Sequence, residues 1–69
     1  MSTGDAPVWD PIDLAIVGLL AEGSTVDAIA RKVGLSERTV RRRLRVLAAG
    51  LGVETTIEVV VHAVRSGLV

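Results

Sequence analysis

The sequence predicts an all-α fold, a four-helix bundle with no sheet, from two observations. Apolar residues recur at three- and four-residue steps along most of the chain, and glycines followed by capping residues interrupt this pattern. The valine run at 59–61 has a strand-like composition, but its apolar flanks keep the helical spacing. We therefore expect one helical domain at residues 9–69, preceded by a flexible arm or linker remnant at residues 1–8.

The first helix is bounded by Asp10 and Gly23. Asp10 is a good N-cap, Pro11 suits the first helical position, and a glycine is a common helix stop. The apolar residues expected to face inward are Ile12, Ile16, Leu19 and Leu20. Trp9 precedes the cap, where it could pack on Leu14 or cover the edge of the core.

A second helix is expected at residues 26–33, capped by Thr25. Its inward residues are Ile29, Ala30 and Val33. Gly34 permits the left-handed conformation of a sharp turn, and Leu35 plugs that turn. Ser36 then caps a third helix, so residues 26–44 carry the helix-turn-helix pattern.

The third helix is expected at about residues 37–49 and ends at Gly50 or Gly52. Its inward stripe consists of Val40, Leu44, Leu47 and Leu51. A fourth helix follows at about residues 55–66. Its apolar residues cover more than half of its circumference, so one core face cannot take all of them. This excess predicts either self-association through the last helix or a helix that is wholly buried.

The distribution of charge indicates a function. The chain has eight basic and eight acidic residues, yet seven of the basic residues fall between positions 31 and 45. They are Arg31, Lys32, Arg38, Arg41, Arg42, Arg43 and Arg45. An even distribution would place about two basic residues there. On a helical wheel Arg38, Arg41, Arg42 and Arg45 share the outward side of the third helix, and Arg43 points sideways beside Thr39.

A solvated helix face with internal ion pairs is the usual explanation for a run of charge. Here only Glu37 can pair within the helix, with Arg41 at i,i+4. Arg38, Arg42 and Arg45 have no such partner, and unrelieved like charge destabilises an isolated protein. An anionic partner explains the pattern better. Because a major groove admits one α-helix, the sequence predicts binding to double-stranded DNA.

The side chains that the sequence offers also predict which base pairs the domain would recognise. The chain has neither Asn nor Gln, the residues that pair bidentately with adenine. Arginine pairs bidentately with the O6/N7 edge of guanine. We therefore expect direct readout to favour G·C pairs, with contacts from Val or Thr to thymine methyl groups as a secondary contribution.

Composition argues against several other classes of protein. The chain has no Cys and one His, so neither a disulfide framework nor a zinc site is available. His62 is expected at the surface, without a nucleophile beside it. The sequence also has no glycine-rich loop of the kind that binds phosphate. We expect no enzyme activity, no cofactor and no metal. With no signal peptide and no apolar run of membrane-spanning length, we expect a cytoplasmic, nucleoid-associated protein.

The run from Leu19 to Val69 resembles the LuxR-type (LuxR/FixJ/GerE) DNA-binding domain. The shared marks are Ala21-Glu22-Gly23, Ile29-Ala30, Gly34-Leu35-Ser36, Thr39-Val40, Leu51-Gly52-Val53, and Ala63 followed by Gly67-Leu68. The stretch from Ser36 to Val40, placed between these marks, is quite specific, and RTVRRR most resembles variants in actinobacterial transcription regulators. With the first helix, the resemblance covers about five-sixths of the chain.

The resemblance implies a LuxR-type effector domain that binds promoter DNA as a homodimer, with the third helix in the major groove. By position, the implied DNA contacts are Arg41, Arg42 and Arg45 at the bases and groove, and Thr25 and Thr39 at phosphates. The last helix would form the dimer contact, to which we assign Val60, Val61 and Val64, leaving Val59 and Ala63 to the core.

Three departures from the LuxR-type pattern change these expectations. Ile12-Asp13 stands where the family has an Arg-Glu pair, which removes the usual polar link across the bundle. Gly50 replaces a Lys and so removes one phosphate contact. Arg43 replaces a His and is expected to supply another phosphate contact.

Two alternatives share the same pattern. A helix-turn-helix can be a protein-interaction module that docks an acidic protein or a receiver-like domain. A sigma-factor promoter-recognition domain would bind DNA without the dimer. The residues also suit both a whole protein and the output end of a longer regulator with a sensor or receiver domain. The operator, and activation as opposed to repression, lie beyond what the sequence predicts.

Overall fold

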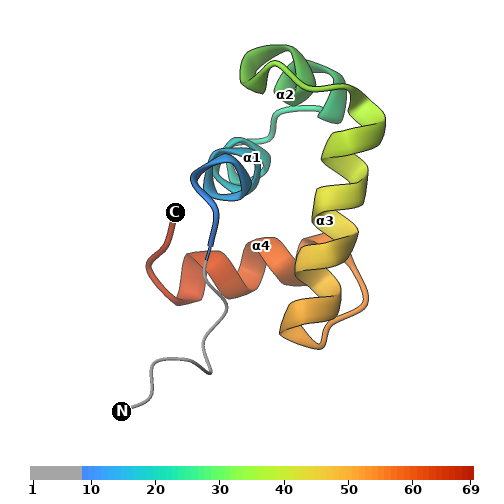
Figure 1. Ribbon diagram of the computed structural model, residues 1–69. Helices are drawn as coiled ribbons and strands as arrows, with labels where there is room; N and C mark the ends of the chain where they lie inside the picture. The colour runs from blue at the N-terminus through green and yellow to red at the C-terminus, as the bar shows by residue number, and fades with distance from the viewer. Residues whose placement is uncertain (1–8) are drawn as a thin grey trace.

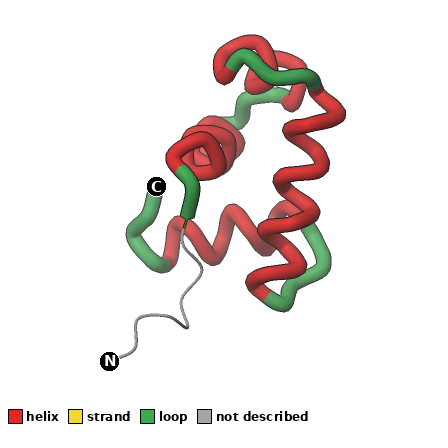
Figure 2. The backbone as a smooth tube through the Cα atoms, viewed as in Figure 1, coloured by secondary structure: helices red, strands yellow, loops and turns green. Residues whose placement is uncertain are grey.

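The computed structural model describes residues 9–69, which form four helices (Figure 1). These are α1 (Pro11–Ala21), α2 (Val26–Val33), α3 (Glu37–Leu51) and α4 (Thr56–Arg65). Residues 9–69 contain no strand (Figure 2). The predicted all-α fold is confirmed, while the arm predicted at residues 1–8 lies outside the described residues. None of the four helices is long and apolar enough to cross a membrane.

The helices begin at side chains that accept backbone hydrogen bonds. The predicted caps Asp10, Thr25 and Ser36 are confirmed, and Thr55 caps α4. At Thr55 the contact is reciprocal: its Oγ1 accepts from the Glu58 N–H at 3.2 Å, and Glu58 Oε1 accepts from the Thr55 N–H at 3.1 Å. Local chemistry therefore sets where each helix starts.

Left-handed glycines end the two helices of the helix-turn-helix. Gly34 has a φ of 75° and closes α2, as predicted, with Leu35 packed against the core beneath the turn. Gly52 has a φ of 73° and closes α3, while Gly50 remains helical. Of the two stops expected for α3 the later one is used, so the helix extends to Leu51.

The four helices surround one apolar core. In Figure 1, α1 is viewed nearly end-on at the centre, α2 lies above it, α3 runs down one side, and α4 crosses below. α1 packs against each of the other three helices. The buried residues are Ile16, Val17, Ile29, Ala30, Val40, Leu44, Ala48, Val59 and Ala63. All nine are apolar. Within residues 9–69, no buried side-chain nitrogen or oxygen lacks a hydrogen-bond partner.

The core corrects part of the predicted inward set. Ile12 lies in the first turn of α1 and is 37% exposed, whereas Val17 is buried. The inward side of α1 is centred on Ile16 and Val17, which leaves Ile12 at its border. On α3, Ala48 is buried although it was not predicted, and Leu47 and Leu51 are half-buried against the core. Trp9 packs at the edge of the core, which confirms one of its two expected positions.

Candidate nucleic-acid interface

The outward side of α3 carries four exposed arginines. Their positions are Arg38, Arg41, Arg42 and Arg45, and all four are exposed as predicted. The opposite side of the helix is held by Val40 and Leu44, which are 0% and 4% exposed. Because these buried residues fix the rotation of α3, Arg38 and Arg42 project away from the bundle, while Arg41 and Arg45 lie at the border with α2 and α4.

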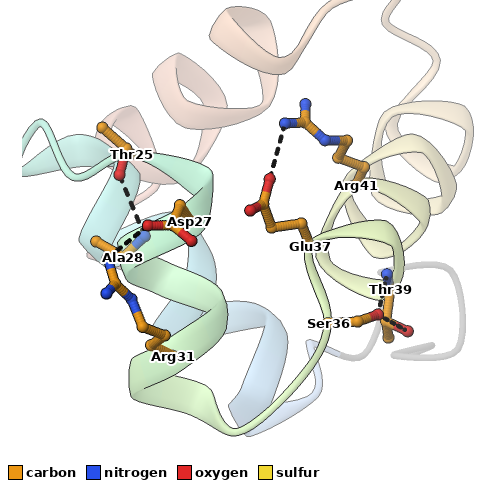
Figure 3. A network of polar contacts seen from close by, with 8 residues as sticks. All are labelled: Thr25, Asp27, Ala28, Arg31, Ser36, Glu37, Thr39 and Arg41. Carbon is orange, nitrogen blue, oxygen red and sulfur yellow. Dashed lines mark hydrogen bonds and ion pairs between the residues drawn. The ribbon is translucent and has the colours of Figure 1, made fainter.

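Carboxylates neutralise only part of this charge. The predicted i,i+4 pair of Arg41 with Glu37 is present at 3.3 Å, on the side of α3 that faces α2 in Figure 3. Arg31 pairs with Asp27 on α2 in the same way. Within residues 9–69 no carboxylate lies within ion-pair distance of Arg38, Arg42 and Arg45. Three exposed cations on one helix face are therefore left for an external anion.

Arg43 has a different environment from the one that the sequence suggests. Its Nη1 lies 3.0 Å from Asp13 Oδ1 of α1, and the two side chains are 32% and 15% exposed. The ion pair with Asp13 thus holds the Arg43 side chain against α1, away from the outward side of α3. The pair also supplies a polar link across the bundle, the feature that Ile12 was expected to remove. The phosphate contact predicted for Arg43 would require this pair to break, so we propose no DNA contact for Arg43.

Two hydroxyl groups flank the arginine face, the surface of α3 formed by Arg38, Arg41, Arg42 and Arg45. Thr25 Oγ1 accepts from the Ala28 N–H at 3.1 Å (Figure 3) and is exposed at the start of α2. Thr39 Oγ1 accepts from the Ser36 hydroxyl at 3.0 Å in the first turn of α3. Each hydroxyl acts as an acceptor in these bonds, which leaves its own hydrogen free to donate, for instance to a phosphate oxygen.

A groove of about 390 Å³ adjoins the arginine face. Its lining residues are Val26, Arg41, Leu44, Arg45 and Thr56, from α2, α3 and α4. Sequence reasoning identified the two arginines but missed Thr56, because residues 45 and 56 meet only once α4 folds back on α3. The groove places the first residues of α2 and α4 beside two cations of α3.

The last helix is partly exposed, so the alternative of a wholly buried helix is wrong. Val59 and Ala63 are buried as predicted. Val61 and Val64 are 43% and 51% exposed, whereas Val60 is half-buried and packs against the core. The exposed apolar surface of α4 therefore consists of Ile57, which is 74% exposed, with Val61 and Val64, and Val60 lies at its flank.

The fold and the arginine face define a helix-turn-helix domain. A comparison with protein families leads to the same class. Residues 14–52, more than half of the 69-residue chain, match the homeodomain-like domain family. The chain belongs to this family, and its helix-turn-helix supports DNA as a partner. No curated protein and no solved structure gives a significant match. The match spans most of α1 and all of α2 and α3, the elements that build the arginine face.

Replacing Asp13 by Asn should destabilise the domain by about 1–2 kcal/mol, between the values for exposed and buried ion pairs. The change leaves the partly buried Arg43 without its carboxylate. Urea denaturation followed by circular dichroism measures the loss. Asp27→Asn is a matched control, because Asp27 also lies in a first helical turn and also pairs with an arginine. Its pair is more exposed, so it should lose less than about 1 kcal/mol; equal losses would rule out a special role for the tertiary pair.

Proposed function

We propose that the protein is a transcription regulator that binds double-stranded DNA sequence-specifically, with α3 in the major groove. One observation carries the proposal: Arg38, Arg42 and Arg45 project together from α3 with no carboxylate partner among residues 9–69. A local basic face attracts DNA phosphates even on a neutral chain, because screening restricts the field to short range. The major groove is wide enough for one helix.

The proposed contacts fall into two groups. Arg42 and Arg45, with Arg38 and Arg41 beside them, would meet base edges and the groove. Thr25 and Thr39 would donate their hydroxyl hydrogens to phosphates on either side. The position of Thr25 at the N-cap of α2 suits a phosphate, because the helix dipole and free N–H groups favour an anion there. With no Asn or Gln in the chain, we propose that readout favours G·C pairs.

We further propose that the domain is of LuxR type and acts in the bacterial cytoplasm, at the nucleoid, as a homodimer. The exposed Val61 and Val64 support an interface on α4, with Val60 at its edge. Two such domains related by a two-fold axis would read half-sites about one helical turn apart. We assign the domain no catalytic role, since helix-turn-helix domains of this family are typically non-enzymatic. A sensor or receiver domain joined to it would place the DNA binding under control of a signal.

Arg42→Ala should weaken binding to a selected duplex by about 1–3 kcal/mol and relax discrimination at one base pair, if Arg42 reads a guanine. Electrophoretic mobility shifts on single-base variants of that duplex measure both effects. A uniform loss over all sequences, with a shallower salt dependence, would instead make Arg42 a phosphate contact. Arg65→Ala is the matched control, since Arg65 is exposed and unpaired on α4 among the described residues. If no duplex shifts at all, the protein-interaction alternative replaces the proposal.

Val61→Glu should abolish pairing of two domains, because it places a charge in an apolar contact. Sedimentation with a duplex that carries two half-sites should show cooperative occupancy for the wild type and independent occupancy for the variant. Affinity for a single half-site should stay within about twofold, since Val61 lies on α4 and not on the arginine face. Ala15→Glu, which adds the same charge to an exposed site on α1, should keep the cooperativity. Independent occupancy in the wild type would contradict the dimer.

A further inference from the structure

One apolar side chain of α3 has no packing role. Val46 is 66% exposed and is the only large apolar residue of this fully described helix to lie exposed. The other large apolar residues of α3 are either buried or packed against the core, and the small Ala49 is exposed. A β-branched residue at an exposed helical position is also less favourable than Ala. Neither packing nor helix stability explains a valine here.

The position of Val46 relative to Arg42 suggests a role at the DNA. The two residues are one helical turn apart, so their side chains lie on neighbouring parts of the same outward surface. Four residues advance about 6 Å along a helix axis, and base pairs rise about 3.4 Å along the DNA axis. Because a helix in the major groove lies oblique to the DNA axis, a docking that brings Arg42 to base edges brings Val46 to base edges about one or two pairs away.

The chemistry of the groove then restricts what Val46 can contact. Donors and acceptors line the major-groove edges, and the 5-methyl group of thymine is their one apolar feature. Building on the DNA binding proposed above, we propose that Val46 contacts the methyl group of a thymine about one or two base pairs from the guanine read by Arg42. Val46 thereby selects a T·A pair beside the G·C pairs that the arginines select.

The test uses a duplex that the wild-type protein selects from a random-sequence library. Each thymine of this duplex is replaced in turn by deoxyuridine, which removes the 5-methyl group and leaves base pairing unchanged. The wild type should lose affinity about fourfold at one thymine, the value for withdrawing one buried methyl group. Val46→Ala should bind the thymine and uracil duplexes equally. Its melting temperature should be unchanged or higher, which a structural role for Val46 would not allow.

Ile57→Ala is the matched control, because it shortens an aliphatic side chain that is 74% exposed on α4. This variant should keep the wild-type sensitivity to uracil. The inference is overturned if the wild type tolerates uracil at every position, if Val46→Ala keeps the sensitivity, or if the selected site has no thymine near its guanines. A protein that selects no duplex would refute the proposed DNA binding as well, whereas one that binds tightly without methyl dependence refutes only the role of Val46.

Discussion

The burial of one side of α3 determines what the rest of the molecule can do. Val40, Leu44 and Ala48 lie in the core, so the rotation of this helix about its axis is fixed. A helix that was free to rotate would let its arginines find carboxylates elsewhere on the domain. Held by its apolar side, α3 presents Arg38, Arg42 and Arg45 outward, where residues 9–69 offer no carboxylate to pair with them.

The arginines of α3 consequently divide into two kinds according to where the helix directs them. Arg43 lies at the border of the packed side, where its Nη1 forms an ion pair with Asp13 Oδ1 of α1 at 3.0 Å. The outward arginines have only solvent, or an external anion, as a counterpart. Within the same run of basic residues, Arg43 thus joins two helices of the fold, while Arg42 and Arg45 remain available to an anionic partner. An arginine run in a sequence is not by itself a count of DNA contacts.

Local signals made much of this fold predictable from the sequence. The caps Asp10, Thr25 and Ser36, and the left-handed Gly34, act within one helical turn, so their positions in the chain predict the start and end of helices. The i,i+4 pair of Glu37 and Arg41 is predictable for the same reason. Family membership at residues 14–52 agrees with the helix-turn-helix that these signals define.

Contacts between helices were not predictable in the same way. Helical spacing places Ile12 on the inward side of α1, but in the packed bundle that side is centred on Ile16 and Val17, which leaves Ile12 at its border. The pair of Arg43 with Asp13 joins residues thirty positions apart, and the groove that both Thr56 and Arg45 line depends on how α4 folds back. Spacing along one helix holds no information about the angle at which another helix crosses it.

The most direct test of the account is to locate the surface that DNA touches. A ¹H–¹⁵N nuclear magnetic resonance titration with a short duplex that carries a single half-site reports each backbone amide separately. We expect the largest shifts along α3 around Arg38, Arg42 and Arg45, and at the start of α2, with small changes on α4. Shifts concentrated around Val61 and Val64, with α3 unaffected, would contradict the claim that the arginine face binds the duplex.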